Sequence, residues 1–144
     1  MLKAFSIISF LLMVAGLLGL IATSSLLSRA PAVIAVQVAA LALMVWARIT
    51  FGLRSFHATA NPTDGGLVTT GPYRFVRHPI YTAVCLFAFA GALAHISVES
   101  LGFALLVLLG AICRSLCEER LLIEYYPDYS SYAEKTKRML PFVF

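Results

Sequence analysis

Long apolar runs separated by short polar breaks dominate the pattern along this chain. Residues 4–28 contain no charged side chain, and residues 30–47 form a second apolar run. Residues 79–98 form a third run, and a shorter fourth run covers residues 101–113. A helix needs about 20 mostly apolar residues to cross a bilayer, and it satisfies its own backbone hydrogen bonds there. The pattern therefore predicts an all-α integral membrane protein with about four transmembrane helices.

The polar breaks predict that these helices form two hairpins. The expected pairs are residues 4–28 with 30–50, turning at Ser28–Pro31, and residues 79–97 with 100–126, turning near His95–Ser100. Helix-forming residues continue beyond the apolar part of the last helix, so we expect a cytoplasmic extension to Tyr126, where Pro127 stops it. The tail after Pro127 keeps Tyr129, Tyr132 and Met139, and it is expected to pack back onto the helices.

The segment 48–78 joins the two hairpins and is longer than most loops in compact proteins. It carries apolar side chains that need burial, and Asn61–Gly66 is a strong turn signal within it. No repeat or low-complexity linker divides the chain. We therefore expect one membrane domain over residues 1–144, with an N-terminal transmembrane hairpin at 1–50 and a functional part at 51–144.

Composition and charge placement support this interpretation. Of all residues, 60% are hydrophobic and 12% are charged, whereas soluble domains average about 45–50% and about 25%. The net charge is +4, and ten of the eleven Lys and Arg residues fall on one side of a four-helix topology, with Arg29 alone on the other. The positive-inside rule then predicts a multi-pass protein with both termini in the cytoplasm. No basic run with interleaved aromatic residues indicates a nucleic-acid partner, and the sequence leaves the oligomeric state undetermined.

The cysteines and most histidines give little support for a metal site. Cys113 and Cys117 lie one helical turn apart, but no His is near them, and apolar packing is the commoner role of such a pair. His57 is expected to be an ordinary loop residue, and His95 is expected at the opposite membrane face. The sequence thus predicts no metal.

A polar, cationic block precedes the third apolar run and is hard to explain as packing. Pro79 suits the first position of a helix, which places His78 at the cap and Arg77 just outside. A helix N-terminus carries free N–H groups and partial positive charge, so this site suits a carboxylate or a phosphate. Tyr81 lies within the first turn, and Gly71-Pro72 provides a tight turn that brings Tyr73 near the same helix end.

A pair of carboxylates, Glu118 and Glu119, emerges on the neighbouring helix at the same side of the membrane. A ligand with a carboxylate, an ammonium and a flat ring would match both parts, and S-adenosylmethionine has all three. Arg114 lies four residues before Glu118, hence on one helical face, where it can form a salt bridge or hold a substrate anion. Competing interpretations make Arg74 a headgroup anchor, Tyr125 and Tyr126 an interfacial belt, and Glu119 a solvated charge beside Arg120.

Two blocks of this chain resemble the isoprenylcysteine carboxyl methyltransferase family of integral membrane enzymes and its prokaryotic relatives. In order, the residues that carry the resemblance are Leu67–Tyr73 and Arg77–Tyr81, then Glu118–Glu119, Tyr129–Tyr132 and Arg138–Pro141. The resemblance covers about residues 60–144, and the two blocks bracket a helical hairpin.

The resemblance implies a cytoplasm-facing S-adenosylmethionine site that opens sideways into the bilayer. Arg114 corresponds to the substrate-binding arginine and is the candidate catalytic residue. The implied acceptor is a lipophilic small molecule or a prenylated substrate among the membrane lipids, and an anionic head facing Arg114 favours a carboxylate. The residues that correspond to cofactor contacts, with Glu119 completing the carboxylate pair, are Leu67, Val68, Tyr73, His78, Pro79, Tyr81, Glu118 and Glu119.

Three alternatives stay open at this point. One is a phospholipid or other lipid N-methyltransferase. Another is an NADPH-dependent sterol-type reductase, a family that shares a related C-terminal half, although Ile80 and the Gly71-Pro72-Tyr73 turn favour the methyltransferase. The third is a non-enzymatic membrane subunit, which leaves the carboxylate pair without a role.

Overall fold

The computed structural model describes residues 2–52 and 66–140. His57 and most of the predicted Asn61–Gly66 turn lie outside the described residues, as do positions 1 and 141–144. In chain order, the helical elements of the described part are α1 (Leu2–Ala22), α2 (Pro31–Phe51), the 3-10 turn η2 (Gly71–Arg74), α3 (Pro79–Ala94), α4 (Val98–Tyr125) and α5 (Tyr129–Lys135).

Three of these helices, α1, α2 and α4, are long and apolar enough to cross a membrane. The fourth, α3, is also apolar, but it has 16 residues and is shorter than the usual span of about 20. Large apolar side chains cover the outside of the bundle, including Ile8, Val45 and Leu105. These findings confirm an all-α integral membrane protein.

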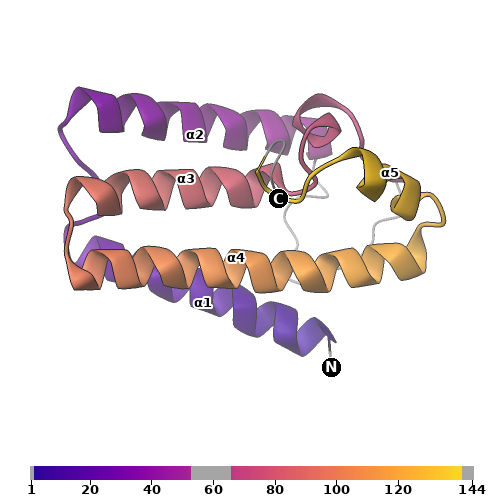
Figure 1. Cartoon of the computed structure of the whole chain (residues 1–144), viewed down its shortest axis with the longest axis horizontal. Helices are drawn as coiled ribbons and strands as arrows, with labels where there is room; N and C mark the ends of the chain where they lie inside the picture. The colour runs from indigo at the N-terminus through magenta and orange to yellow at the C-terminus, as the bar shows by residue number, and fades with distance from the viewer. Residues whose placement is uncertain (1, 53–65, 141–144) are drawn as a thin grey trace.

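The helices follow one another across the bundle in the order α1, α4, α3, α2, each packing on the next. The first predicted hairpin, residues 4–28 with 30–50, is therefore wrong as a packed pair, because α1 packs against α4 and α2 packs against α3. Figure 1 shows that the two hairpin turns lie at one end of the bundle. The N-terminus, η2, α5 and the last described residues gather at the other end. The segments that carry the predicted site residues therefore share one end of the molecule.

Small residues let α1 and α4 approach closely. A Cβ atom added at Gly16 would lie 2.7 Å from the backbone oxygen of Phe103, and one added at Gly110 would lie 2.6 Å from that of Ser9. Transmembrane helices commonly use such small residues to bring their backbones together. This packing places the start of α1 beside the cytoplasmic extension predicted for α4.

Both hairpin turns differ from the predicted ones. Helix α1 ends at Ala22 rather than Ser28, because Thr23 bonds back to the Gly19 carbonyl through its side chain and Ser24 has a φ of 54°. The segment between α1 and α2 is held by Gln37, whose side-chain amide donates to the Leu26 carbonyl at 2.7 Å.

The second hairpin turn lies earlier in the chain than expected. Helix α3 ends at Ala94, and α4 already begins at Val98 because Ser97 and Ser100 form a reciprocal capping box. At its other end α4 runs to Tyr125, as its helix-forming residues predict, and Pro127 follows. The tail packs back, as expected, with Tyr129 and Met139 buried.

Candidate functional site

The start of α3 is built as the sequence predicts. Pro79 is the first helical residue, and His78 is its N-cap in a non-helical conformation. The backbone N–H groups of Arg77 and His78 do not point to an open site, because they donate to the carbonyls of Lys137 and Arg138 at 2.8 and 2.9 Å. The tail thus occupies part of the helix N-terminus that the sequence assigned to an anion.

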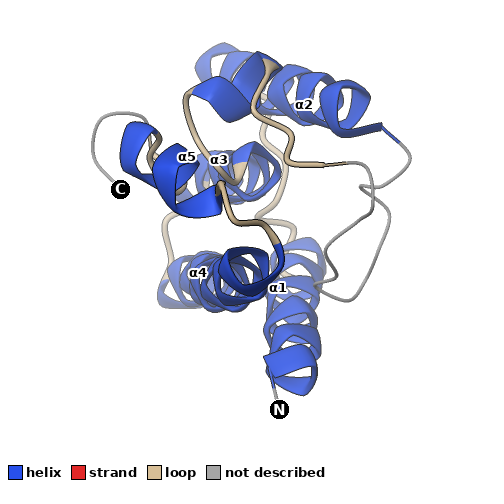
Figure 2. Cartoon of the chain, turned by 90° about the vertical axis from the view of Figure 1, so that its right-hand side faces the viewer, coloured by secondary structure: helices blue, strands red, loops and turns tan. Residues whose placement is uncertain are grey.

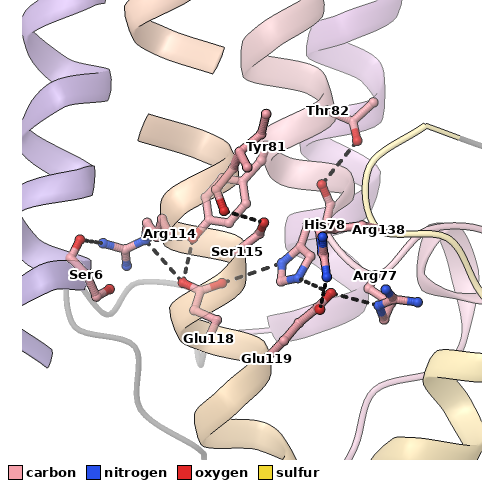
Figure 3. Close-up of polar contacts among 11 residues, drawn as sticks. Ser6, Arg77, His78, Tyr81, Thr82, Arg114, Ser115, Glu118, Glu119 and Arg138 are labelled. Atoms are coloured by element: carbon pink, nitrogen blue, oxygen red, sulfur yellow. Dashed lines mark hydrogen bonds and ion pairs between the residues drawn. The ribbon is translucent and has the colours of Figure 1, made fainter. Parts of the chain in front are cut away.

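The His78 imidazole lies between the two predicted carboxylates (Figure 3). Its Nε2 atom is 3.2 Å from Oε1 of Glu119, and its Nδ1 atom is 3.5 Å from Oε2 of Glu118. Burial lowers the pKa of His78, but the hydrogen bonds and charges of the two glutamates raise it more, and the net direction is upward. The histidine thus bridges two carboxylates, and their charges favour its protonated form.

Glu118 is held on its other side by Tyr81 and Arg114. The Tyr81 hydroxyl donates to Oε1 of Glu118 at 2.5 Å, and Arg114 Nε donates to the same oxygen at 3.1 Å. Arg114 also donates to the Tyr81 hydroxyl at 2.6 Å. The Tyr81 ring stacks on the His78 imidazole with their centroids 5.5 Å apart. The four side chains form one polar cluster between α3 and α4.

Arg114 is buried, and helix α1 closes the cluster behind it. Its Nη1 atom donates to the backbone carbonyl of Ser6 at 3.3 Å, and its guanidinium lies 5.1 Å from the centre of the Phe10 ring. Only 5% of the Arg114 side chain is exposed. In this structure Arg114 therefore orients Glu118 and Tyr81.

Glu119 is surrounded by three cationic groups. Arg77 Nε lies 2.8 Å from its Oε1 atom, which also faces His78, and Arg138 Nη2 lies 2.7 Å from its Oε2 atom. Arg77 in turn donates to the carbonyls of Ala133 and Thr136 in the tail. Glu119 is thus buried, and both of its carboxylate oxygens bind cationic groups. The alternative of a solvated charge beside Arg120 is therefore wrong.

The cluster as a whole carries positive charge. Three guanidinium groups face two carboxylates, which leaves one net positive charge, and His78 adds a second when it is protonated. Glu118 is the more open carboxylate, with 21% of its side chain exposed against 10% for Glu119. Glu118 can therefore reach a ligand's ammonium, and the surplus positive charge favours a ligand that also carries an anion.

The other predicted cofactor residues lie in the segment that leads into α3. Tyr73 is buried against Phe51 with ring centroids 5.5 Å apart, and its carbonyl accepts from the Tyr132 hydroxyl at 2.6 Å. Burial raises the pKa of the Tyr73 hydroxyl above its ordinary value, and the charge of Tyr132 raises it further. Leu67 and Val68 are half-buried and take no part in the polar cluster.

Residues that the sequence did not assign complete the cluster. Arg138 pairs with Glu119, and the Thr82 hydroxyl donates to the Met139 carbonyl at 2.6 Å. Arg138 belongs to the second block of the resemblance, which was its one signal in the sequence. Its pairing with a residue 19 positions away depends on how the tail folds back. Cys113 and Cys117 are free thiols, and within residues 2–52 and 66–140 no three His, Cys, Asp or Glu side chains are grouped to hold a metal ion.

Comparison with known proteins places these features in a family. A family model described as phospholipid methyltransferase matches residues 32–129. The nickel-cobalt-cadmium resistance protein NccN of Alcaligenes xylosoxydans xylosoxydans is 36% identical over 80 residues, which are 52% of this chain and 36% of that protein. The cobalt-zinc-cadmium resistance protein CzcN of Cupriavidus metallidurans is 38% identical over 82 residues, 52% of this chain and 35% of that protein. The match thus spans little more than a third of these relatives, and no solved structure matches the chain.

The family match covers the first block and the Glu118–Glu119 pair of the second, and it ends at residue 129, before Arg138. It confirms the predicted relationship to membrane methyltransferases at the level of the family. The narrower resemblance to isoprenylcysteine carboxyl methyltransferases stays a prediction.

Proposed function

Because the chain belongs to the phospholipid methyltransferase family, we propose that it transfers a methyl group from S-adenosylmethionine to a lipophilic acceptor at the cytoplasmic membrane face. The observation that carries this proposal is the cluster in which His78 bridges Glu118 and Glu119 between α3 and α4. The positive-inside rule supports a cytoplasmic site, because every described Lys and Arg except Arg29 lies in the segments that meet at this end of the bundle.

The donor set fits the amino-acid part of the cofactor. Glu118, the more exposed carboxylate, is proposed to accept from the ammonium of the cofactor, and the net positive charge of the cluster complements the carboxylate of the cofactor. Tyr73 and Tyr81 offer aromatic faces beside the start of α3 for the adenine ring or the ribose. Leu67, Val68 and Pro79 are proposed as the apolar contacts, and Glu119 is proposed to serve the cofactor by holding His78.

Methyl transfer from this cofactor requires little chemical activation by the protein itself. The bound cofactor supplies a methyl group already activated by its sulfonium. The chain's side chains therefore have to align the acceptor with that methyl group and keep water out. The Tyr81–Glu118–Arg114 contacts are suited to this because they are buried and mutually fixed, with donor–acceptor distances of 2.5 to 3.1 Å.

For the acceptor, we propose a lipid-tailed molecule with a carboxylate head. Such an anion can take the place of Glu118 on the Arg114 guanidinium, because both ligands are carboxylates. Drawing a lipid tail into water costs about 0.8 kcal/mol per methylene, so the acceptor is expected to enter from the bilayer. The second candidate is an aminophospholipid, which the description of the matching family favours.

The test is binding and turnover with the purified protein in lipid nanodiscs. Calorimetry should show binding of S-adenosylmethionine and of S-adenosylhomocysteine, and no binding of NADPH. Radiolabelled methyl transfer to a prenylated cysteine with a free carboxylate is then compared with transfer to phosphatidylethanolamine. Transfer to the amine alone would replace the first acceptor by the second. A folded protein that binds neither form of the cofactor would refute the methyltransferase, and binding of NADPH instead would favour the reductase.

A further inference from the structure

The last described residues lie in register beside the start of α3. Lys137 forms a parallel bridge with Val76, and the N–H of His78 donates to the Arg138 carbonyl at 2.9 Å. The Thr82 hydroxyl then holds the Met139 carbonyl. These backbone contacts bring residues 137–139, called the tail segment below, to the edge of the cluster.

The side chain of Arg138 reaches into this cluster and ends on Glu119 (Figure 3). Its Nη2 atom lies 2.7 Å from Oε2 of Glu119, and the other carboxylate oxygen of Glu119 lies 3.2 Å from His78. His78 in turn faces Glu118, the more open carboxylate. A chain of charged contacts therefore leads from the tail segment to the residue that is placed to meet the ligand.

The two carboxylate oxygens of Glu119 bind different cationic groups, and this arrangement helps to hold His78 in place. With Arg138 on Oε2, the Oε1 atom is left for Arg77 and His78. A buried carboxylate that loses one counter-ion is strongly unfavourable and takes up another partner. Without Arg138, Glu119 is expected to draw His78 toward itself and away from Glu118.

We propose that Arg138 is a positioning residue of the cofactor site, which acts through Glu119 to hold His78 between the two carboxylates. The inference rests on the proposed function for the identity of the ligand. The proposed role of Arg138 differs from simple anchoring of the tail. The tail has other anchors, namely its backbone contacts and Arg77, which donates to the Ala133 and Thr136 carbonyls.

A matched control lies next to Arg138 in the same tail segment. Lys137 has the same charge and takes part in the backbone bridge to Val76, but its side chain is exposed. Lys137→Ala removes a positive charge and leaves the backbone contacts in place. Arg138→Lys keeps the charge near Glu119, and Arg138→Gln removes the charge while keeping a donor.

The first measurement is affinity for S-adenosylhomocysteine by calorimetry in nanodiscs. Arg138→Ala and Arg138→Gln should weaken binding by about tenfold, within the usual range for groups in one ionic network. Arg138→Lys should recover most of the affinity, and Lys137→Ala should bind like the wild type. If Lys137→Ala weakens binding as much as Arg138→Ala does, the effect comes from a loosened tail and the proposal is overturned.

The second measurement does not need the cofactor, since it follows the titration of His78 by NMR of histidine-labelled protein. The groups that face His78 are Glu118 and Glu119 from α4, Tyr81 from α3, and Arg77 beside it, with Arg138 reaching it through Glu119. Loss of the Arg138 charge should raise the pKa of His78, because a nearby positive charge disfavours its protonated form. Arg138→Lys should restore the wild-type value, and an unchanged pKa in Arg138→Gln would overturn the proposal.

A double-mutant cycle tests the route through Glu119. If Arg138 acts through this carboxylate, Arg138→Gln should change affinity much less in a Glu119→Gln background than in the wild type. Additive effects would overturn the proposed route. A wild-type protein that binds no cofactor would refute the proposed function instead, and the titration of His78 would still decide whether Arg138 controls it.

Discussion

Tyr81 and Glu118 are joined by a 2.5 Å hydrogen bond that crosses from α3 to α4. The tyrosine hydroxyl is the donor, and it accepts in turn from Arg114 at 2.6 Å. One hydroxyl therefore connects a carboxylate and a guanidinium that already share a helix. The orientation of Glu118 depends on α3 as much as on α4, which bears it.

Tyr81→Phe should consequently weaken cofactor binding while leaving the fold intact. The variant keeps the ring that stacks on His78 but removes the hydroxyl between Glu118 and Arg114. Hydrogen bonds to charged groups contribute about 1.5–3 kcal/mol, so affinity for S-adenosylhomocysteine should fall by about tenfold or more. Tyr125→Phe, on the half-exposed end of α4, is the matched control and should bind normally. Equal affinities in the two variants would contradict a role for the Tyr81 hydroxyl.

Arg114→Ala should destabilise the protein and raise the KM for a carboxylate acceptor. The substitution removes one of the two charged partners of Glu118 and leaves only His78, and removal of one partner from a buried pair costs up to about 3–5 kcal/mol. Unfolding in detergent measures this loss, and Arg74→Ala, at an exposed position, should change stability by less than about 0.5 kcal/mol. If the KM for the acceptor does not change in a folded Arg114→Ala protein, Arg114 has no part in acceptor binding.

Stability should fall as pH rises above neutrality because of His78. Its pKa in the folded protein lies above the ordinary value of about 6.5. The stabilisation is therefore fully present below about pH 6.5 and is lost as pH rises through the folded pKa. Melting temperatures across this range should show the decline in the wild type and a flatter profile in His78→Gln.

His95→Gln is the control for this pH dependence. His95 lies at the other end of the bundle, where its Nε2 atom is 2.8 Å from the Leu27 carbonyl. The decline in stability should therefore persist in His95→Gln. If it disappears in that variant, His95 and not His78 causes the pH dependence.

Two glycines on the second hairpin should respond in opposite ways to alanine. A Cβ atom at Gly91 would collide with the carbonyl of Leu26 in the loop after α1, whereas one at Gly102 would meet nothing within 4 Å. Gly91→Ala should destabilise by about 1–3 kcal/mol through overpacking. Gly102→Ala should stabilise by up to about 1 kcal/mol, because alanine favours the helix. Thermal unfolding in detergent compares the two, and equal shifts would contradict the close packing at Gly91.

Local signals in the sequence were sufficient for much of the site. Proline at position 79 fixed the start of α3 and with it the place of His78, since both effects act on neighbouring residues. The continuation of α4 to Tyr125 followed from the absence of a helix breaker before Pro127. The predicted helix ends at the hairpin turns were less accurate. Ser24 lies at the end of α1 and the Ser97–Ser100 cap begins α4, and both lie within apolar stretches of the sequence.

The partners of the charged residues were not predictable in the same way. The sequence predicted that Arg77 and His78 line an anion site and that Glu119 is one of two carboxylates that face a ligand. In the structure these residues pair with one another, because α4 and the tail fold against the start of α3. Pairings over 41 and 42 positions depend on the tertiary fold, which no local pattern encodes.

The contact of His78 with the Arg138 carbonyl also sets the order in which the site is assembled during synthesis. Residues 137–139 are translated after all four long helices, so the N–H groups of Arg77 and His78 and the carboxylate of Glu119 lack these partners until the tail has been made. The cluster is therefore complete only when the tail has folded back against the start of α3.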